Sequence, residues 1–266
     1  MLLREVAYAK PSSVAEALEL LAADDGARAL AGGQTLINVM KARAGSPDTL
    51  VDLNGLDGLK GIELGADGTL EIGAMTTYSE IMASSEARAR PILGDVCAQI
   101  ADVQVRNRGT IGGNVCTNDP TNHLPPLLAA LGATFTIAGA DGERTVSSDD
   151  FFLGVYLTAV GPGELLTRIS VPAGKQDGFA AVTLGADGTC IANAAASIDG
   201  GRVRVALGCV DAVPVVVTAD GPEGVGAAVD AANLMPPFDV HASSEYRGHL
   251  ARVLAIRAAE QAAGRS

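Results

Sequence analysis

The sequence has no tryptophan, and aromatic residues make up only 3% of its 266 positions. Its core must therefore be aliphatic, which a hydrophobic content of 48% allows. Basic residues are also scarce, because 19 Lys and Arg stand against 31 Asp and Glu, for a formal net charge of −12. Without a dense basic cluster, we expect neither a nucleic-acid partner nor binding to an acidic membrane surface.

Long apolar runs and closely spaced cysteines are absent as well. No stretch is long enough to span a bilayer, and the N-terminal residues MLLREVAYAKPSS lack the apolar segment and cleavage site of a secretory signal. We therefore expect no membrane insertion. The four cysteines lie far apart, with no Cys-x-x-Cys pair, which is typical of free thiols in a reducing compartment. We expect a cytoplasmic location and no metal site in this chain; the cysteines are Cys97, Cys116, Cys190 and Cys209.

Glycine, in contrast, is abundant, with 32 residues where ~7% of positions would be usual. Much of it marks turns, and in four segments an Asp-Gly pair stands before a run of strand-like composition, which predicts tight antiparallel hairpins. The four segments are GADGTLEIGA (65–74), AGADGERTV (138–146), LGADGTCIA (184–192) and SIDGGRVRVAL (197–207).

Helices are indicated at other places. Ser13-x-x-Glu16 is a capping box before VAEALELLA, and residues 243–263 open on a serine cap with apolar residues near helical spacing. The fold class is therefore α+β. A boundary is indicated at ISVPAGKQDG (169–178), where a strand-like run ends at a proline. Farther on, TADGPEGVG (218–226) is interpreted as a surface loop.

A pair of glycines interrupts the segment ARALAGGQTLINVMKAR (27–43). A short apolar strand is followed by Gly32-Gly33, by polar Gln34-Thr35, and then by a helix. This order allows backbone N–H groups to face an anion at a place where any Cβ would block close approach. It matches neither the P-loop nor the G-x-G-x-x-G pattern, so an ordinary tight turn is the alternative interpretation.

A second glycine pair lies in RGTIGGNVCTNDPTNHLPPLLAALGA (108–133). Residues 110–114 are expected to offer consecutive main-chain donors, together with a hydroxyl and an amide, and so to hold a pyrophosphate without a lysine. We expect Gly113 to meet the phosphate oxygens with φ above zero. Two neutral anion loops of this kind could hold one dinucleotide from both sides.

Together the two motifs resemble the FAD-binding medium subunit of the molybdenum hydroxylases, the family of the carbon monoxide dehydrogenase flavoproteins and of the flavin domain of xanthine dehydrogenase. The resemblance extends over nearly the whole chain, including FFLGVYLTAVGPGELLTRISVP (151–172) and the C-terminal helix. It implies a two-part, PCMH-like FAD-binding domain over residues 1–173. A smaller α+β domain with a short antiparallel sheet and helices would follow over residues 174–266.

The resemblance also implies which residues contact FAD. Residues 31–36 would form the first pyrophosphate loop and residues 110–114 the second. Ile100 and Leu165 would lie against the flavin, with ordinary core packing as the alternative, and Asp119 has a turn role as its alternative. The full set is Ala31, Gly32, Gly33, Gln34, Thr35, Leu36, Ile100, Thr110, Ile111, Gly112, Gly113, Asn114, Asp119, His123 and Leu165.

The chain departs from the family pattern at two places. His123 stands where relatives commonly have an acidic residue, and we expect it near the cofactor without acting as an acid or base. In residues 177–198 the lysine and paired arginines with which relatives open the C-terminal domain are missing. Contact between that domain and the flavin is therefore left open.

No general-base pair, serine–histidine–acid set or metal cluster is evident, so we assign no catalytic residue. The resemblance implies an oxidoreductase subunit that binds FAD and transfers electrons. A small iron–sulfur subunit would reduce it with electrons from a large molybdopterin-binding subunit, in a dimer of heterotrimers, and an external acceptor would take them up. Two alternatives are a self-contained FAD-dependent oxidase and a non-catalytic scaffold subunit that has lost flavin.

Overall fold

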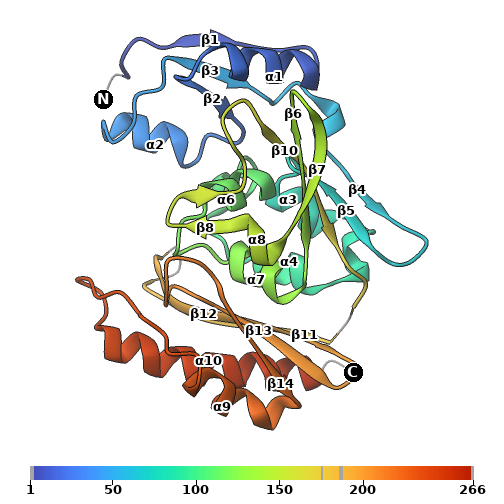
Figure 1. Cartoon of the computed structure of the whole chain (residues 1–266), viewed down its shortest axis with the longest axis vertical. Helices are drawn as coiled ribbons and strands as arrows, with labels where there is room; N and C mark the ends of the chain where they lie inside the picture. Colours follow the sequence, from blue (N-terminus) through green and yellow to red (C-terminus); the bar gives the residue numbers. More distant parts are fainter. Residues whose placement is uncertain (1–2, 175, 186–187, 265–266) are drawn as a thin grey trace.

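The computed structural model describes residues 3–174, 176–185 and 188–264. Three sheets follow one another along the long axis of the molecule (Figure 1), with the N-terminal sheet at one end and the C-terminal sheet at the other. Helices lie beside each of them. The α+β class predicted from the sequence is confirmed.

The first sheet is small and parallel, with strand order β1-β3-β2. Helix α1 (Val14–Ala23) connects β1 to β2, and the Ser13 hydroxyl caps it by accepting from the Glu16 N–H at 3.1 Å. The Glu16 carboxylate accepts from the N–H of Ser12 rather than that of Ser13, so the predicted capping box is displaced by one residue. The Asp-Gly turns in the sequence indicate only antiparallel hairpins, because two parallel strands must be joined by a longer crossover connection. The strands are β1 Ala7–Ala9, β2 Ala27–Leu30 and β3 Thr49–Asp52.

The second sheet is antiparallel, in the order β4-β5-β10-β6-β7. Asp-Gly hairpins join β4 to β5 and β6 to β7, as the sequence predicts, with positive φ at Gly68 (85°) and Gly142 (106°). Strand β10 lies between the two hairpins and joins them into one sheet. The bounds are β4 Ile62–Leu64, β5 Leu70–Gly73, β6 Thr134–Gly139, β7 Gly142–Ser147 and β10 Leu165–Val171.

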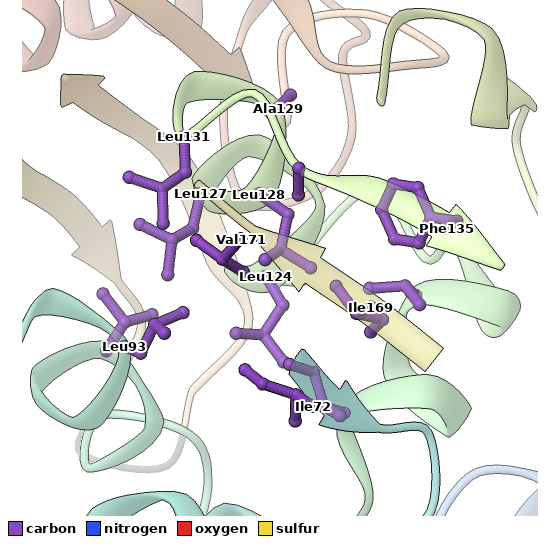
Figure 2. Packing of buried hydrophobic residues seen from close by; sticks show 14 of the residues in the cluster. Ile72, Leu93, Leu124, Leu127, Leu128, Ala129, Leu131, Phe135, Ile169 and Val171 are labelled. Atoms are coloured by element: carbon purple, nitrogen blue, oxygen red, sulfur yellow. The ribbon is translucent and has the colours of Figure 1, made fainter. Parts of the chain in front are cut away.

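The main hydrophobic core lies between this sheet and the helices around α7 (Leu124–Ala130) (Figure 2). Every residue of α7 is buried, and Pro125 and Pro126 occupy its first turn, where a missing N–H costs no helical hydrogen bond. Aliphatic side chains thus provide the core that the scarcity of aromatic residues requires. The remaining elements here are α3 Tyr78–Ala83, α4 Ile92–Cys97, α5 Val103–Arg106, α6 Ile111–Thr117, α8 Ser148–Phe151, β8 Phe152–Gly154 and β9 Leu157–Thr158.

The third sheet is antiparallel, with its strands in sequence order. Helix α10 (Ser244–Gly264) covers one face and α7 approaches the other (Figure 1). The helix and sheet meet through alanines, and at Gly178 a Cβ would lie 2.0 Å from the carbonyl oxygen of Ala258. The Ser243 hydroxyl caps α10, as predicted. The strands are β11 Asp177–Thr183, β12 Cys190–Asp199, β13 Arg202–Gly208 and β14 Val215–Asp220.

Two predictions about this region need comment. The surface loop predicted over 218–226 is wrong, because β14 extends to Asp220 and helix α9 (Val225–Asp230) begins within the segment and buries Val225. Of the Asp-Gly turn at 187–188, the aspartate lies outside the described residues, although the flanking strands β11 and β12 do pair. The division after residue 173 remains a prediction, and it falls between β10 and β11.

A buried ion pair joins the segment just before α4 to the first strand of the third sheet. The Arg90 guanidinium donates to both carboxylate oxygens of Asp177, at 2.8 and 2.9 Å, and to the Ser197 hydroxyl at 2.9 Å. It also donates to the Pro172 carbonyl oxygen. Only 3% of Arg90 and 1% of Asp177 are exposed. Removing one partner would therefore leave a charge without compensation in a dry environment.

We predict that Arg90→Met lowers the free energy of unfolding by about 3–5 kcal/mol, because the Asp177 carboxylate stays buried without its partner. Urea titration followed by circular dichroism measures this. Arg252→Met is the matched control, since Arg252 pairs with Asp230 at an exposed site and should cost only ~0–1 kcal/mol. Equal effects of the two substitutions would show that the buried pair does not hold β11 to the segment before α4.

Candidate cofactor site

The first glycine motif forms a tight turn between β2 and α2 (Leu36–Lys41). Gly33 has φ of 72°, a conformation that side chains with a Cβ rarely adopt. Two bonds hold the turn, from the Gln34 amide to the Gly32 carbonyl and from the Asn54 amide to the Ala31 carbonyl. Within the described residues, no protein acceptor receives the N–H groups of residues 32–35. The turn therefore offers adjacent main-chain donors, as the sequence predicts for an anion loop.

The second motif is built differently. Its N–H groups already have protein acceptors: Ile111 donates to the Thr76 carbonyl at 3.0 Å, Gly112 to the Ala74 carbonyl at 2.9 Å and Gly113 to the Thr110 hydroxyl at 3.0 Å. The Asn114 N–H bonds to the Thr110 carbonyl as the first turn of α6. The prediction of a second run of free main-chain donors over residues 110–114 is therefore wrong. A Thr-capped helix begins here, and its geometry uses those donors.

The positive φ predicted for Gly113 is also wrong. Gly113 lies in the first turn of α6, in a helical conformation that any residue can adopt. Crowding explains instead why this position is a glycine, because a Cβ would lie 2.9 Å from the Thr110 hydroxyl oxygen. Gly112 is more constrained, since a Cβ there would lie 2.6 Å from both the carbonyl oxygen and the Cβ of Ala74. This glycine allows α6 to pack directly on the end of β5.

What the second motif does offer is a side chain. The Asn114 amide donates to the Tyr78 hydroxyl at 3.0 Å, and its Oδ1 is buried with no partner in the described protein. Burial raises the pKa of Tyr78, so its phenol is neutral. A buried acceptor without a donor costs about 1–3 kcal/mol. A bound group that donates to Asn114 would remove this cost.

The two motifs meet at one place. A Cβ on Gly32 would lie 2.1 Å from the Arg108 carbonyl oxygen, just before the second motif, and a Cβ on Gly113 would lie 3.6 Å from that of Ala31. The free N–H groups of the first turn thus lie beside the start of α6, the helix that carries Asn114. Backbone donors suit a pyrophosphate, and a buried acceptor suits a hydroxyl or N–H of the rest of a dinucleotide. The residues present therefore fit FAD.

The other predicted residues make their recorded contacts with different partners, outside this junction. Leu165 is buried in the hydrophobic cluster beside the first sheet, where it packs with residues such as Leu21 and Val51. Ile100 is half-buried against the main core, and its carbonyl accepts from Arg106 at 3.0 Å. Asp119 closes a turn by accepting from the N–H and the hydroxyl of Thr121, at 2.9 and 2.7 Å. These contacts are those of the core and turn alternatives.

His123 begins helix α7 and is buried against the third sheet. Its Nδ1 lies 3.2 Å from the Asn193 side-chain nitrogen, and its ring meets that of Phe179 edge-on at 5.3 Å. The sequence interpretation did not single out Asn193 or Tyr78. Asn193 could have been found, because it is a polar residue in an otherwise apolar strand. Tyr78 gives no such signal.

Within the described part of the chain, no group of three or more His, Cys, Asp or Glu side chains is placed to hold a metal ion. None of the helices in the same part of the chain combines the length and the hydropathy needed to cross a membrane.

The fold and the paired glycine motifs define an FAD-binding domain of the PCMH-like type. The family described as the FAD binding domain in molybdopterin dehydrogenase matches residues 4–174. The chain is 37% identical to the carbon monoxide dehydrogenase medium chain of Afipia carboxidovorans, over 97% of each chain. It is 33% identical to the glyceraldehyde dehydrogenase medium chain of Sulfolobus acidocaldarius, over 97% of this chain and 99% of that one.

A solved structure agrees with these sequence relatives. The reconstituted CO dehydrogenase from Oligotropha carboxidovorans contains a chain that superimposes with a TM-score of 0.90 and 34% identity, over 100% of both chains. The protein therefore belongs to the FAD-binding medium subunits of the molybdenum hydroxylases. It is an oxidoreductase flavoprotein whose cofactor is FAD.

We predict that Gly33→Ala lowers FAD affinity by about tenfold or more, because a shift of the turn misaligns N–H groups whose bonds to a charged phosphate are worth ~1.5–3 kcal/mol each. Titration with FAD, followed by flavin fluorescence, measures the loss. Gly132→Ala is the matched control, since Gly132 has a similar φ of 65° and open space around it. Both variants should lose ~1–2 kcal/mol of stability from strain. Equal FAD affinity in the two would remove Gly33 from the site.

Proposed function

We propose that this chain transfers electrons from the iron–sulfur clusters of a small partner subunit to an external acceptor, the electrons coming from a molybdopterin-binding large subunit. The observation that carries the proposal is the junction of the two glycine motifs, which provides a cofactor site without substrate-directed acids or bases. The relatives named as medium chains of dehydrogenases support it.

In this proposal the first turn holds the pyrophosphate of FAD through the N–H groups of residues 32–35. The Asn114 amide binds a polar group of the same molecule from the opposite motif. The isoalloxazine ring supplies the redox chemistry when FAD is bound, and the protein orients it and excludes water. We retain Ile100, Asp119, His123 and Leu165 as predicted neighbours of the cofactor, although their contacts in the protein are explained without it.

The histidines support an electron-transfer role. His123 is engaged with Asn193 and Phe179, while His241 is exposed in the segment before α10 and His249 lies within that helix. A reaction on a small substrate would need a base beside a serine or cysteine at the glycine junction. Among the described residues, none of the three histidines has this placement. Substrate chemistry is therefore assigned to a partner.

An exposed apolar hairpin provides a docking surface close to this junction. Strands β8 and β9 form it, and four large apolar residues at its tip are 50–63% exposed, namely Leu153, Val155, Tyr156 and Leu157. The Asn118 side chain, at the end of α6, donates to the carbonyls of Gly154 and Leu157 at 2.7 and 3.2 Å. A partner bound to the hairpin would therefore be held beside the helix that carries Asn114.

The alternatives fit less well. A self-contained oxidase needs a base and a substrate pocket, and a scaffold subunit without flavin has no need for unpaired donors and an unpartnered Asn114 at the junction. The proposed assembly is a dimer of heterotrimers, by analogy with the family. The four free cysteines favour a reducing compartment, in keeping with a cytoplasmic location.

We predict that Asn114→Leu lowers FAD affinity by about tenfold, because the variant removes the acceptor that a bound cofactor would satisfy, worth ~1–3 kcal/mol. The visible spectrum of the purified chain during titration with FAD measures this. Asn107→Leu is the control, since Asn107 is exposed and its side chain accepts a hydrogen bond from the Ser79 hydroxyl. A wild-type chain that takes up no FAD would favour the scaffold alternative.

We also predict that the chain purifies from its native host together with iron and molybdenum, in one peak with flavin. The physical reason is that the flavin needs an electron donor at short range, and no described cysteine cluster could hold an iron–sulfur centre. Affinity purification followed by metal analysis tests this. Charge substitutions at the hairpin tip, such as Leu153→Asp, should separate the metals from the flavin. A metal-free chain that alone oxidises a small substrate would favour the self-contained oxidase.

A further inference from the structure

A buried cluster of polar and nucleophilic side chains lies between α7 and the third sheet. The Asn193 side-chain nitrogen is 3.4 Å from the Cys190 sulfur, 3.9 Å from the Cys209 sulfur and 3.2 Å from His123 Nδ1. Exposure is 8% or less for each of the four residues. Both cysteines are free thiols. Two thiols and an imidazole thus converge on one amide in a place where no function has been assigned.

The backbone deviates from regular strand geometry to bring the two thiols there. The pairing of β11 with β12 shifts so that Val182 faces Ala192 and Thr183 faces Cys190, which makes Ile191 an extra residue. Ile191 packs in the core beneath α10, so the bulge directs Cys190 to the opposite face, where Asn193 lies. Cys209 follows the end of β13 with φ of 65°, which is unusual for a residue with a side chain. Both deviations occur at the cysteines themselves.

The surroundings distinguish these thiols from the other two. A hydrogen bond from the Cys209 thiol, with help from His123 and Asn193, lowers the pKa of Cys190. The same bond and burial raise the pKa of Cys209. Burial alone raises the pKa of Cys97 and of Cys116 to about 12. Since the thiolate is the reactive form, these surroundings favour Cys190 over Cys209 as the attacking sulfur of the pair.

A narrow cleft, with a volume of only about 10 Å³ open to water, lies beside the cluster at Cys209. Its walls come from the turn around Asp119 and Pro120 and from the β13–β14 connection, and Cys209 is part of its lining. A molecule about the size of water can therefore approach Cys209 from this side, although neither thiol is exposed at the surface.

The cluster is also connected to the second glycine motif. The Asn193 side chain lies 3.3 Å from the carbonyl oxygen of Asn122, and the Asn122 side chain donates to the carbonyl oxygen of Asn114 at 3.2 Å. Asn114 in turn donates to Tyr78. A short series of hydrogen bonds thus connects the thiols to the residue whose Oδ1 has no partner in the described protein.

We propose that Cys190 and Cys209 form a peroxide-sensitive thiol pair whose oxidation to a disulfide weakens the hold of the adjoining turn on the cofactor site. The Cys190 thiolate attacks one oxygen of hydrogen peroxide, the O–O bond breaks, and a sulfenic acid and hydroxide are formed. The Cys209 sulfur then attacks the sulfenic sulfur, its proton leaves with the departing hydroxide as water, and an S–S bond forms. In sum, two thiols and one peroxide give one disulfide and two waters, and the two electrons pass from sulfur to oxygen.

The second half of the proposal rests on the proposed flavin function. A disulfide fixes its two Cβ atoms about 3.8 Å apart and removes the thiol hydrogens, so closing it changes what the Asn193 amide meets at both sulfurs. The Asn193 amide then loses its place beside both sulfurs and its bonds to Asn122 and His123. We therefore expect an approximately tenfold loss of FAD affinity in the oxidised form, because the turn at Asn122, which bonds to Asn114, is held less firmly.

The experiment treats the purified full-length chain with hydrogen peroxide and maps its thiols by mass spectrometry, which needs no flavin. We expect a Cys190–Cys209 disulfide, with a mass loss of two hydrogen atoms reversed by dithiothreitol, while Cys97 and Cys116 remain thiols. Cys209→Ser should stop at a Cys190 sulfenic acid that dimedone traps, and Cys190→Ser should leave Cys209 reduced. Cys97→Ser is the control variant and should still form the disulfide.

Oxidation of Cys97 or Cys116 as fast as Cys190, or a Cys190 that stays reduced in the folded wild type, would overturn the thiol pair. FAD titration of the reduced and oxidised forms then tests the coupling, and equal affinity of the two forms would overturn it. If even the reduced form binds no FAD, the proposed function fails, while the mass measurement still decides the thiol chemistry by itself.

Discussion

The close approach of backbone to backbone at Gly32 is the constraint on which the site depends. A single Cβ at this position would lie 2.1 Å from the Arg108 carbonyl oxygen and would force the turn after β2 away from the segment that precedes α6. Gly112 has the same role on the other side, where α6 meets the end of β5. Because no side chain separates these segments, two motifs almost eighty positions apart in sequence form one junction.

The junction divides its chemistry unequally between the two motifs. The first keeps its main-chain donors free, since a turn with positive φ at Gly33 does not close a helical hydrogen-bond pattern. The second begins a capped helix, which uses its N–H groups and leaves the Asn114 side chain to serve a ligand. Similar glycine pairs thus have different roles, because the first is succeeded by an open turn and the second lies inside the first turn of a helix.

Polar groups buried beside the third sheet connect this site to the rest of the molecule. The Arg90–Asp177 pair holds β11 of the third sheet to the segment before α4, and His123 and Asn193 meet where α7 approaches the same sheet. The interface is therefore more than a hydrophobic contact. It contains the reactive thiols and, through the turn at Asn122, adjoins the flavin motif.

The sequence alone determined the α+β class, the described Asp-Gly hairpins, both serine caps and the family, because each depends on residues close together in the chain or on a long match of motifs. Only the tertiary structure decided that the first sheet is parallel, that residues 110–114 form a helix with occupied donors, and that 218–226 belongs to a strand and a helix. It also decided that Leu165 and Asp119 make core and turn contacts. Tyr78, Asn193 and the Cys190–Cys209 pair became visible only in the fold, because their partners lie on other elements, and sequence spacing does not record which residues meet across an interface.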